Sequence, residues 1–245
     1  MTIRYEANPP KILPDVDTDQ SIKKFVERIK DISKKCDAIH LTENVLGFQR
    51  VSPLEVGKII RKEITNLPIT VSLRVRDKSE EEIFEFVENC VEIGFTGILV
   101  LIGDPSQTGN ADSGQIPSLT VKKLKEKNVD AKIELYLSVS NKPNFSKLGK
   151  KTDAKPKGFM TQVVQNVEQV QELADNLKGF SVIPIILFPS QKNEKSAKFL
   201  DLNLETYSQE FEELLKKAHE ITGDVLLTSP NDFTGLNEFL GKASF

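Results

Sequence analysis

Eight short apolar segments, repeated along the whole chain, constrain the fold more than any other feature of this sequence. They begin near Ile3, Ala38, Thr70, Gly97, Lys132, Phe159, Ser181 and Asp224, about 20 to 45 residues apart. Segments such as 97–102 and 182–188 are apolar continuously and not alternately, which is typical of strands covered on both faces of a parallel sheet. The pattern therefore predicts an α/β protein.

Most gaps between these segments hold a helical pattern. Apolar residues recur at helical spacing within 22–32, 83–91, 167–177 and 207–218, and a further helix begins at Ser52-Pro53. Asp19 or Ser21 would cap the first helix, and Ser52 would cap the second with Pro53 at its first position. Strands that alternate with helices in this way favour βαβ units.

The length of 245 residues decides how many such units the chain can form. Eight strand–helix units without a composition break predict one (β/α)8 TIM barrel that spans residues 1–245 as a single domain. The alternative is an open doubly wound sheet. No G-x-G-x-x-G follows the first strand, so the dinucleotide fingerprint of that fold is missing.

Composition excludes several classes of function. With two cysteines and two histidines the chain lacks the residues for a disulfide framework or a zinc cluster, so we expect no metal site. A net charge of −3 gives no general attraction to nucleic acid. No segment approaches the roughly 18 apolar residues of a membrane helix, and no signal-peptide core is visible, so we expect a cytoplasmic protein without membrane contact.

Polar residues at the strand ends mark the candidate site, because the active-site face of a barrel lies at the carboxyl ends of its strands. Glu6 ends the first strand, Asp104 follows the fourth and Gln162 ends the sixth. Together they would supply an acid, a charge near a cofactor and a substrate-binding amide. Each strand end must also become polar where the chain meets water. We assign His40, on the second strand, to the barrel wall and not to a catalytic base.

Four motifs carry a resemblance to a known family. Glu6-Ala7-Asn8-Pro9-Pro10 resembles the first-strand motif of methylenetetrahydrofolate reductases, which are flavin-dependent barrels, and Gly103-Asp104-Pro105 is similar to their fourth-strand motif. The segment 151–154 (Lys-Thr-Asp-Ala), followed by Thr161-Gln162, matches a further pair of family motifs. The similarity runs in order over most of the chain.

The resemblance implies an activity and a role for each matching residue. The activity is flavin-dependent reduction of 5,10-methylenetetrahydrofolate, or a related methylene-pterin, to the 5-methyl form. Glu6 would be the general acid, Asp104 would lie beside the flavin and the pterin, and Gln162 would bind the folate. The flavin, FAD in preference to FMN, would be reduced by NAD(P)H or a redox partner protein. Its expected contacts are Thr42, Ser72, Gly103, Asp104, Asn144 and Lys151.

Departures from the family pattern keep a second function open. Ile102 replaces the family's usual arginine, Ser72 its histidine and Asn144 an aspartate. A barrel that binds pterin without flavin chemistry of its own, acting with a partner enzyme, is therefore the alternative. The loop from Gly103 to Gly114 would be a lid or a cofactor loop, and lysines 142–157 would meet an anionic cofactor or substrate tail, or only solvent. The oligomeric state is left open.

Overall fold

The computed structural model describes residues 2–105 and 112–242, and its strands close into a barrel. All neighbouring strands pair in parallel, and β1 pairs with both β2 and β8. The prediction of a single (β/α)8 TIM barrel is confirmed. The strands are β1 (Thr2–Ala7), β2 (Ala38–Leu41), β3 (Ile69–Arg74), β4 (Gly97–Leu101), β5 (Glu134–Val139), β6 (Gly158–Val163), β7 (Ser181–Leu187) and β8 (Asp224–Thr228).

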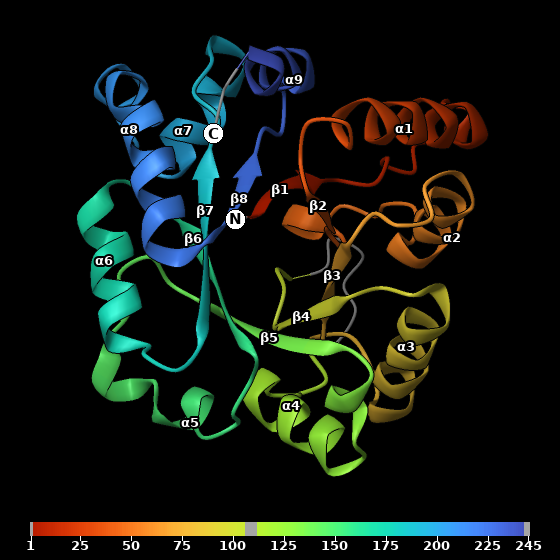
Figure 1. The fold of residues 1–245 in the computed structure, drawn as a ribbon. Coiled ribbons are helices and arrows are strands. Elements are labelled where there is room, and N and C mark those ends of the chain that lie inside the picture. Colours follow the sequence, from red (N-terminus) through yellow and green to blue (C-terminus); the bar gives the residue numbers. More distant parts are fainter. Residues whose placement is uncertain (1, 106–111, 243–245) are drawn as a thin grey trace.

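Helices surround these strands (Figure 1). They are α1 (Thr18–Ile32), α2 (Pro53–Glu63), α3 (Glu80–Ile93), α4 (Pro117–Glu126), α5 (Gly149–Thr152), α6 (Val167–Asn176), α7 (Glu194–Phe199), α8 (Leu204–Thr222) and α9 (Phe233–Lys242). Short 3-10 turns are η1 (Val45–Gly47), η2 (Val129–Ala131), η3 (Phe145–Lys147) and η4 (Gln191–Asn193). In the described ranges, no helix is long and apolar enough to cross a membrane.

Two predicted boundaries were wrong for local reasons. Asp17, and not Asp19 or Ser21, caps α1, because its Oδ1 accepts a hydrogen bond from the Gln20 amide at 3.0 Å. The Ser21 hydroxyl lies one turn inside and donates to the Asp17 carbonyl. The fifth strand begins at Glu134 and not near Lys132, because η2 occupies the residues just before it.

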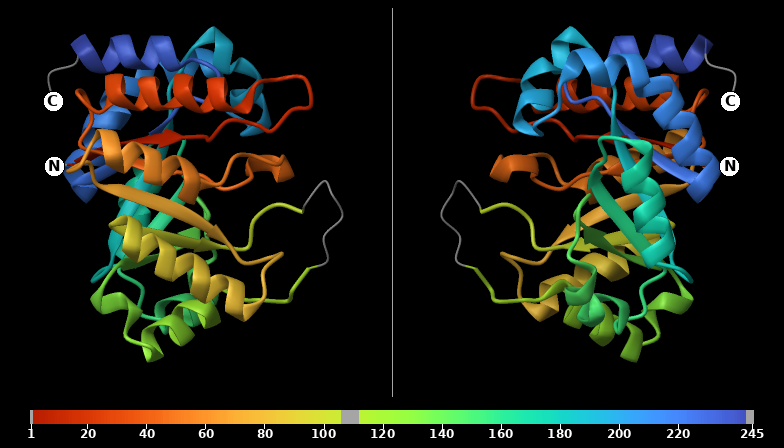
Figure 2. Two further views of the ribbon diagram at one scale, coloured as in Figure 1. Left: turned by 90° about the vertical axis from the view of Figure 1, so that its right-hand side faces the viewer. Right: turned by 90° about the vertical axis from the view of Figure 1, so that its left-hand side faces the viewer.

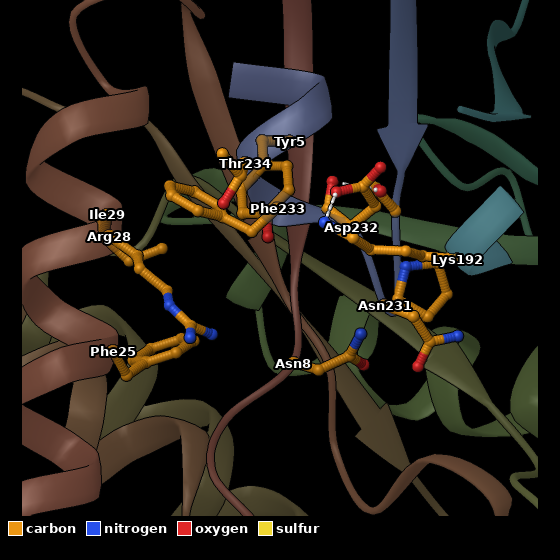
Figure 3. Close-up of a pocket in the computed structure, with 12 residues that line it drawn as sticks. Tyr5, Asn8, Phe25, Arg28, Ile29, Lys192, Asn231, Asp232, Phe233 and Thr234 are labelled. Carbon is orange, nitrogen blue, oxygen red and sulfur yellow. Dashed lines mark hydrogen bonds and ion pairs between the residues drawn. The ribbon is translucent and has the colours of Figure 1, made fainter. Parts of the chain in front are cut away.

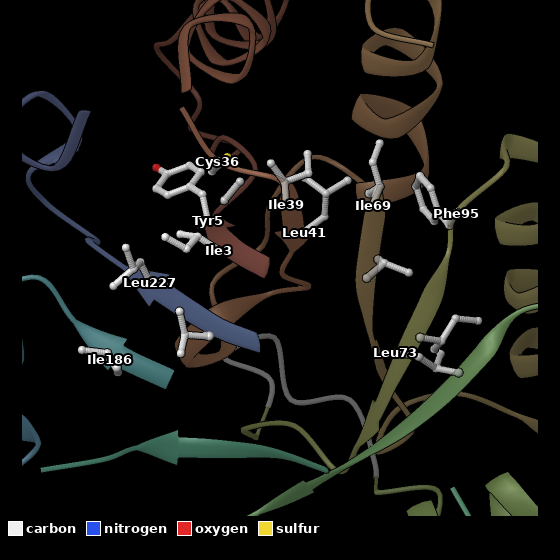
Figure 4. Close-up of a cluster of buried hydrophobic side chains, with 14 of the residues drawn as sticks. Ile3, Tyr5, Cys36, Ile39, Leu41, Ile69, Leu73, Phe95, Ile186 and Leu227 are labelled. Atoms are coloured by element: carbon white, nitrogen blue, oxygen red, sulfur yellow. The ribbon is translucent and has the colours of Figure 1, made fainter. Parts of the chain in front are cut away.

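The main core lies between the strands and the helices. Alternate strand residues point outward, and in β1 to β3 these are Ile3, Tyr5, Ile39, Leu41, Ile69, Val71 and Leu73. They pack against the apolar stripes of the helices, such as Ile22, Val26 and Ile29 of α1. Figure 4 shows several of these side chains on the outer side of the strands. All six residues of β3 are buried, as expected for a strand covered on both faces.

A second, smaller cluster fills the barrel interior. Its buried members are Leu99, Tyr136, Met160, Ile183 and Leu226. These five residues come from β4 to β8, so the apolar filling occupies one side of the interior. The inward positions of β1 to β3 are polar instead, with Glu6 in register with His40, and the His40 imidazole in contact with two hydroxyls of β3. The interior is therefore apolar beside β4 to β8 and polar beside β1 to β3.

A buried ion pair lies where the barrel closes. The Arg4 guanidinium of β1 donates to both oxygens of the Asp224 carboxylate of β8, from Nε to Oδ1 at 2.8 Å and from Nη2 to Oδ2 at 2.6 Å. The side chains of Arg4 and Asp224 are only 11% and 20% exposed. Such a pair costs desolvation energy, but removing one partner costs more, since the remaining charge is left buried and unpaired.

We therefore expect Asp224→Asn to lower the free energy of unfolding by about 3 kcal/mol, the scale for a broken buried pair. The exposed pair Lys30–Glu63 provides the control, and Glu63→Gln should change stability by less than about 1 kcal/mol. Urea denaturation measures both. Similar losses in the two variants would contradict a special role for the pair at the closure.

Candidate active site at the carboxyl end of the barrel

The carboxyl ends of the strands form one mouth of the barrel, and the loops after β1, β2 and β4 project beyond it (Figure 2). Glu6, Thr42 and Gln162 lie at the ends of β1, β2 and β6, whereas Asp104 and Lys151 lie in the loops after β4 and β5. The topology thus brings the predicted residues to one face. Among the described residues, no hydrogen bond or ion pair joins Glu6, Asp104 and Gln162 to one another.

Glu6 is a partly buried carboxyl group with one oxygen anchored and the other unused. The Thr228 hydroxyl of β8 donates a hydrogen bond to Glu6 Oε1 at 2.7 Å. Within the described ranges, Oε2 has no hydrogen-bond partner. Burial raises the pKa of Glu6, while the Thr228 hydrogen bond and the positive charge of Arg50 act against that rise. A carboxyl group with a raised pKa and a free oxygen is suited to hold and deliver a proton.

Arg50 is held near Glu6 by contacts between the loops after β1 and β2. Lys11 and Arg50 form an antiparallel bridge, and the Arg50 Nη1 donates to the Pro9 carbonyl at 2.6 Å. Its buried Nε has no partner among the described residues. The guanidinium therefore places a positive charge beside the Glu6 carboxyl, which favours the ionised form once that group has released its proton.

A β-bulge places Gln162 at the mouth. The pairing of β6 with β7 shifts between Met160 and Val163, and the Thr161 hydroxyl accepts a hydrogen bond from the Ile185 amide at 3.0 Å in place of a backbone carbonyl. Thr161 is buried whereas Gln162 is exposed. The Thr-Gln pair thus has a local cause: the threonine stabilises the bulge, and the bulge leaves the glutamine amide available to a ligand.

Two predicted cofactor contacts have side chains already engaged within the protein. The Thr42 hydroxyl donates to Asn8 Oδ1 at 2.8 Å, and the Ser72 hydroxyl lies 2.9 Å from His40 Nε2. Thr42 and Ser72 are only 6% and 5% exposed. Their hydroxyls therefore support the first three strands, and neither is free to bind a ligand in this arrangement.

His40 is a structural residue, but its imidazole lies among the inward polar side chains of β1 to β3 and not in the barrel wall where we expected it. Its Nδ1 lies 2.9 Å from the Thr70 hydroxyl, so both ring nitrogens have hydroxyl partners. Burial, together with the positive charge of Arg4, lowers the pKa of His40 to about 3. The imidazole is therefore neutral at physiological pH and does not reach the mouth.

Arg74 organises the loops that carry Gly103 and Asp104. Its Nη1 donates to the Asn44 carbonyl at 2.8 Å and its Nη2 to the Asp104 carbonyl at 2.7 Å. Gly103 has φ +85°, and a Cβ there would lie 2.7 Å from Arg74 Nε, so glycine is required for this close approach. The exposed Asp104 carboxylate accepts from the Leu46 amide at 3.0 Å, which joins the loops after β2 and β4.

Lys151 is a half-buried cation with no acidic partner in the described part of the chain. Its ammonium donates to the Ser138 carbonyl at the end of β5, at 2.6 Å, and burial lowers its pKa. The predicted contact Asn144 is exposed, and its side-chain oxygen accepts from the Ser146 hydroxyl. Lys151 is therefore the predicted contact best placed to attract an anionic group.

Sequence reasoning missed three residues that shape this mouth. Thr228 orients Glu6, Arg50 places a charge beside it, and Arg74 joins two loops. Of these three, only Arg74 could have been found from the sequence, because it is a charged residue at the end of an apolar strand. The predicted lid, 103–114, includes residues 106–111, which lie outside the described residues. The described ranges hold no cluster of three metal-ligating side chains.

Solved structures with this barrel give the chain its context. No protein-family profile and no curated protein matches it. It is similar to an uncharacterised Clostridium thermocellum protein that binds two copies of 5-methyl-5,6,7,8-tetrahydrofolic acid, with TM-score 0.68, 15% identity, and coverage of 98% of this chain and 94% of the other. It is also similar to 2,3-dimethylmalate lyase of the PEP mutase/isocitrate lyase superfamily, with TM-score 0.59, 10% identity, and coverage of 98% and 78%. These likenesses show the fold.

The raised pKa of Glu6 predicts a pH-dependent stability difference from Glu6→Gln. Below about pH 4, where glutamate is protonated in both the folded and unfolded states, the difference should be constant. As the pH rises through the raised pKa, the wild type should lose stability relative to the variant, because ionising Glu6 is harder in the folded state. Urea denaturation across this range measures the trend. A difference that does not change with pH would contradict the assigned burial.

Proposed function

We propose that this protein binds a reduced folate, or a related pterin, at the carboxyl mouth of its barrel and reduces the 5,10-methylene form to the 5-methyl form. The observation that carries the proposal is Glu6, a partly buried acid at the mouth with one oxygen anchored by Thr228 and the other free. The Clostridium thermocellum protein, which binds 5-methyltetrahydrofolate on a similar barrel over nearly its full length, supports the ligand class.

Glu6 would act by protonating the leaving nitrogen. The bond between the methylene carbon and N10 breaks, its electron pair takes the Glu6 proton, and the methylene carbon remains on N5 as an iminium. A hydride added to that carbon completes the methyl group. Thr228 donates to Oε1, so the proton is carried on the free Oε2. The Arg50 charge then stabilises the carboxylate until solvent returns a proton.

A flavin, when bound, would supply the hydride. Its fit is best on the β4–β5 side of the mouth, where the Lys151 ammonium would attract a cofactor phosphate and the Asp104 carboxylate is exposed. The Thr42 and Ser72 hydroxyls, which we expected to contact it, are engaged with Asn8 and His40. The Lys151 ammonium and the Asp104 carboxylate on the β4–β5 side are the groups that support a bound flavin, and we propose FAD in preference to FMN.

The engaged hydroxyls favour a second candidate. If Thr42 and Ser72 stay bound to their protein partners, the barrel would bind pterin without a flavin of its own. It would then act with a partner enzyme that supplies the hydride. Pterin binding at Glu6 and Gln162 is common to both candidates, so it is tested first.

Calorimetric titration with 5-methyltetrahydrofolate tests pterin binding. Gln162→Ala should weaken binding about three- to tenfold, the range for one neutral hydrogen bond. Gln171→Ala is the matched control, because Gln171 is an exposed glutamine on α6 whose side-chain amide donates a hydrogen bond to Asp175. Absence of binding by the wild-type protein, or equal loss in both variants, would reject the proposed ligand or the role of Gln162.

An absorption spectrum of the purified protein, followed by assay with 5,10-methylenetetrahydrofolate, tests the chemistry. We expect a bound flavin that the methylene substrate reoxidises, and Glu6→Gln should slow this step at least about a hundredfold, as for loss of a general acid, while flavin stays bound. Pterin binding by a colourless protein that takes up neither FAD nor FMN would select the second candidate.

A further inference from the structure

A pocket of about 210 Å³ lies outside the barrel, between α1 and the start of α9. It is lined by Tyr5 of β1, by Asn8 in the loop that follows and by the segment from Ser229 to Thr234. Figure 3 shows the pocket with Arg28 of α1 reaching into it from one side and Asn8 pointing into it from below. None of the residues proposed for pterin or flavin binding lines it.

Three aromatic rings contribute to the apolar part of a wall that is otherwise polar. The Tyr5 and Phe233 rings meet edge to face, with their centroids 6.0 Å apart, and Phe25 of α1 lines the same space. Rings in this arrangement present faces and edges on which a planar ligand can stack. The pocket volume of about 210 Å³ is somewhat larger than the roughly 150 Å³ cavity that holds benzene, which suits a ligand of one ring with a small substituent.

The pocket also carries one unneutralised positive charge. Lys192 pairs with Asp232, Nζ to Oδ1 at 2.9 Å, so these two charges cancel. Arg28 has no acidic partner in the described part of the chain. The guanidinium lies over the Phe233 ring, 5.6 Å from guanidinium carbon to ring centroid. The guanidinium donors are therefore available to an anion that enters the pocket.

The Asn8 amide is oriented by its neighbour. Its side-chain oxygen accepts the Thr42 hydroxyl hydrogen bond, which leaves the NH2 group without a partner among the described residues. Figure 3 shows this nitrogen directed into the pocket. Asn8 thus adds a neutral donor opposite the Arg28 cation, and both donors suit the oxygen atoms of one anionic group.

We propose that this pocket is a second binding site, for a small aromatic monocarboxylate. The planar guanidinium of Arg28 would bind the carboxylate through two parallel hydrogen bonds, the Asn8 amide would donate a third, and the ligand ring would lie against Phe233 and Tyr5. A single net positive charge favours a monoanion over a doubly charged phosphate. The site shares no lining residue with the proposed pterin and flavin contacts and does not depend on the proposed function.

Benzoate is the probe, and NMR titration of the backbone amides of the full chain is the measurement. We expect saturable shifts at the residues around Arg28 and Phe233. Acetate, which lacks the ring, and inorganic phosphate, which lacks the ring and carries more charge, should bind at least tenfold more weakly at equal ionic strength, since about 1.4 kcal/mol corresponds to tenfold.

Variants of α1 separate a specific site from general attraction. Arg28→Gln should weaken benzoate binding about tenfold. Arg28→Lys should have an intermediate effect, because lysine keeps the positive charge but cannot donate two parallel hydrogen bonds to the carboxylate. Lys24→Gln, on the exposed face of α1, should leave benzoate binding unchanged. Glu6→Gln should bind benzoate as the wild type does. Thermal melts establish that every variant is folded.

Three results would overturn the proposal. They are a lack of saturable benzoate shifts, equal effects of Arg28→Gln and Lys24→Gln, and acetate or phosphate binding as tight as benzoate. The proposal would also be overturned if benzoate shifted the amides of residues at the mouth and these shifts were absent in Glu6→Gln. That result would place benzoate in the pterin site. A failure of folate binding leaves each of these outcomes unaffected, so the two proposals fail separately.

Discussion

Closure of the barrel between β1 and β8 is the constraint on which the rest of the structure depends. It joins the two strands that lie furthest apart in the chain, and the Arg4–Asp224 ion pair lies at that seam. The same seam brings the Thr228 hydroxyl to Glu6 at the mouth and the Phe233 ring to Tyr5 outside the barrel. Both proposed sites therefore exist only because the chain closes on itself.

The polar interior beside β1 to β3 and the proposed chemistry are linked. The Thr70 and Ser72 hydroxyls that hold His40 in place are no longer available to a ligand, so these hydroxyls of β3 do not contribute to the mouth. The polar groups available to a ligand lie instead at the ends of β1 and β6, on Glu6 and Gln162, and in the loop after β5, where Lys151 has no acidic partner among the described residues. A pterin would be bound between the closure seam and the β5–β6 side, opposite the strands whose hydroxyls are engaged.

Local signals made much of the fold predictable. Apolar runs located all eight strands, because strands buried on both faces leave a continuous pattern. The predicted helices α1, α2, α3, α6 and α8 have strong apolar periodicity. α4 begins without a side-chain cap, and α5 and α7 are too short for a clear period, so these were not predicted. The Asp17 cap was missed because Asp17, Asp19 and Ser21 all lie near the start of α1 and each carries a side-chain oxygen that can cap a helix.

By itself, the sequence determined the barrel and the strand ends at which Glu6 and Gln162 stand, because periodicity and strand order are local properties of the chain. Only the tertiary structure decided which polar groups are free. The sequence offered Thr42, Ser72 and Lys151 alike as contacts, yet the two hydroxyls are engaged by Asn8 and His40, whereas the Lys151 ammonium meets a backbone carbonyl and has no acidic partner among the described residues. The pocket beside Arg28 carried no sequence signal, since its walls come from opposite ends of the chain and meet only when β1 pairs with β8.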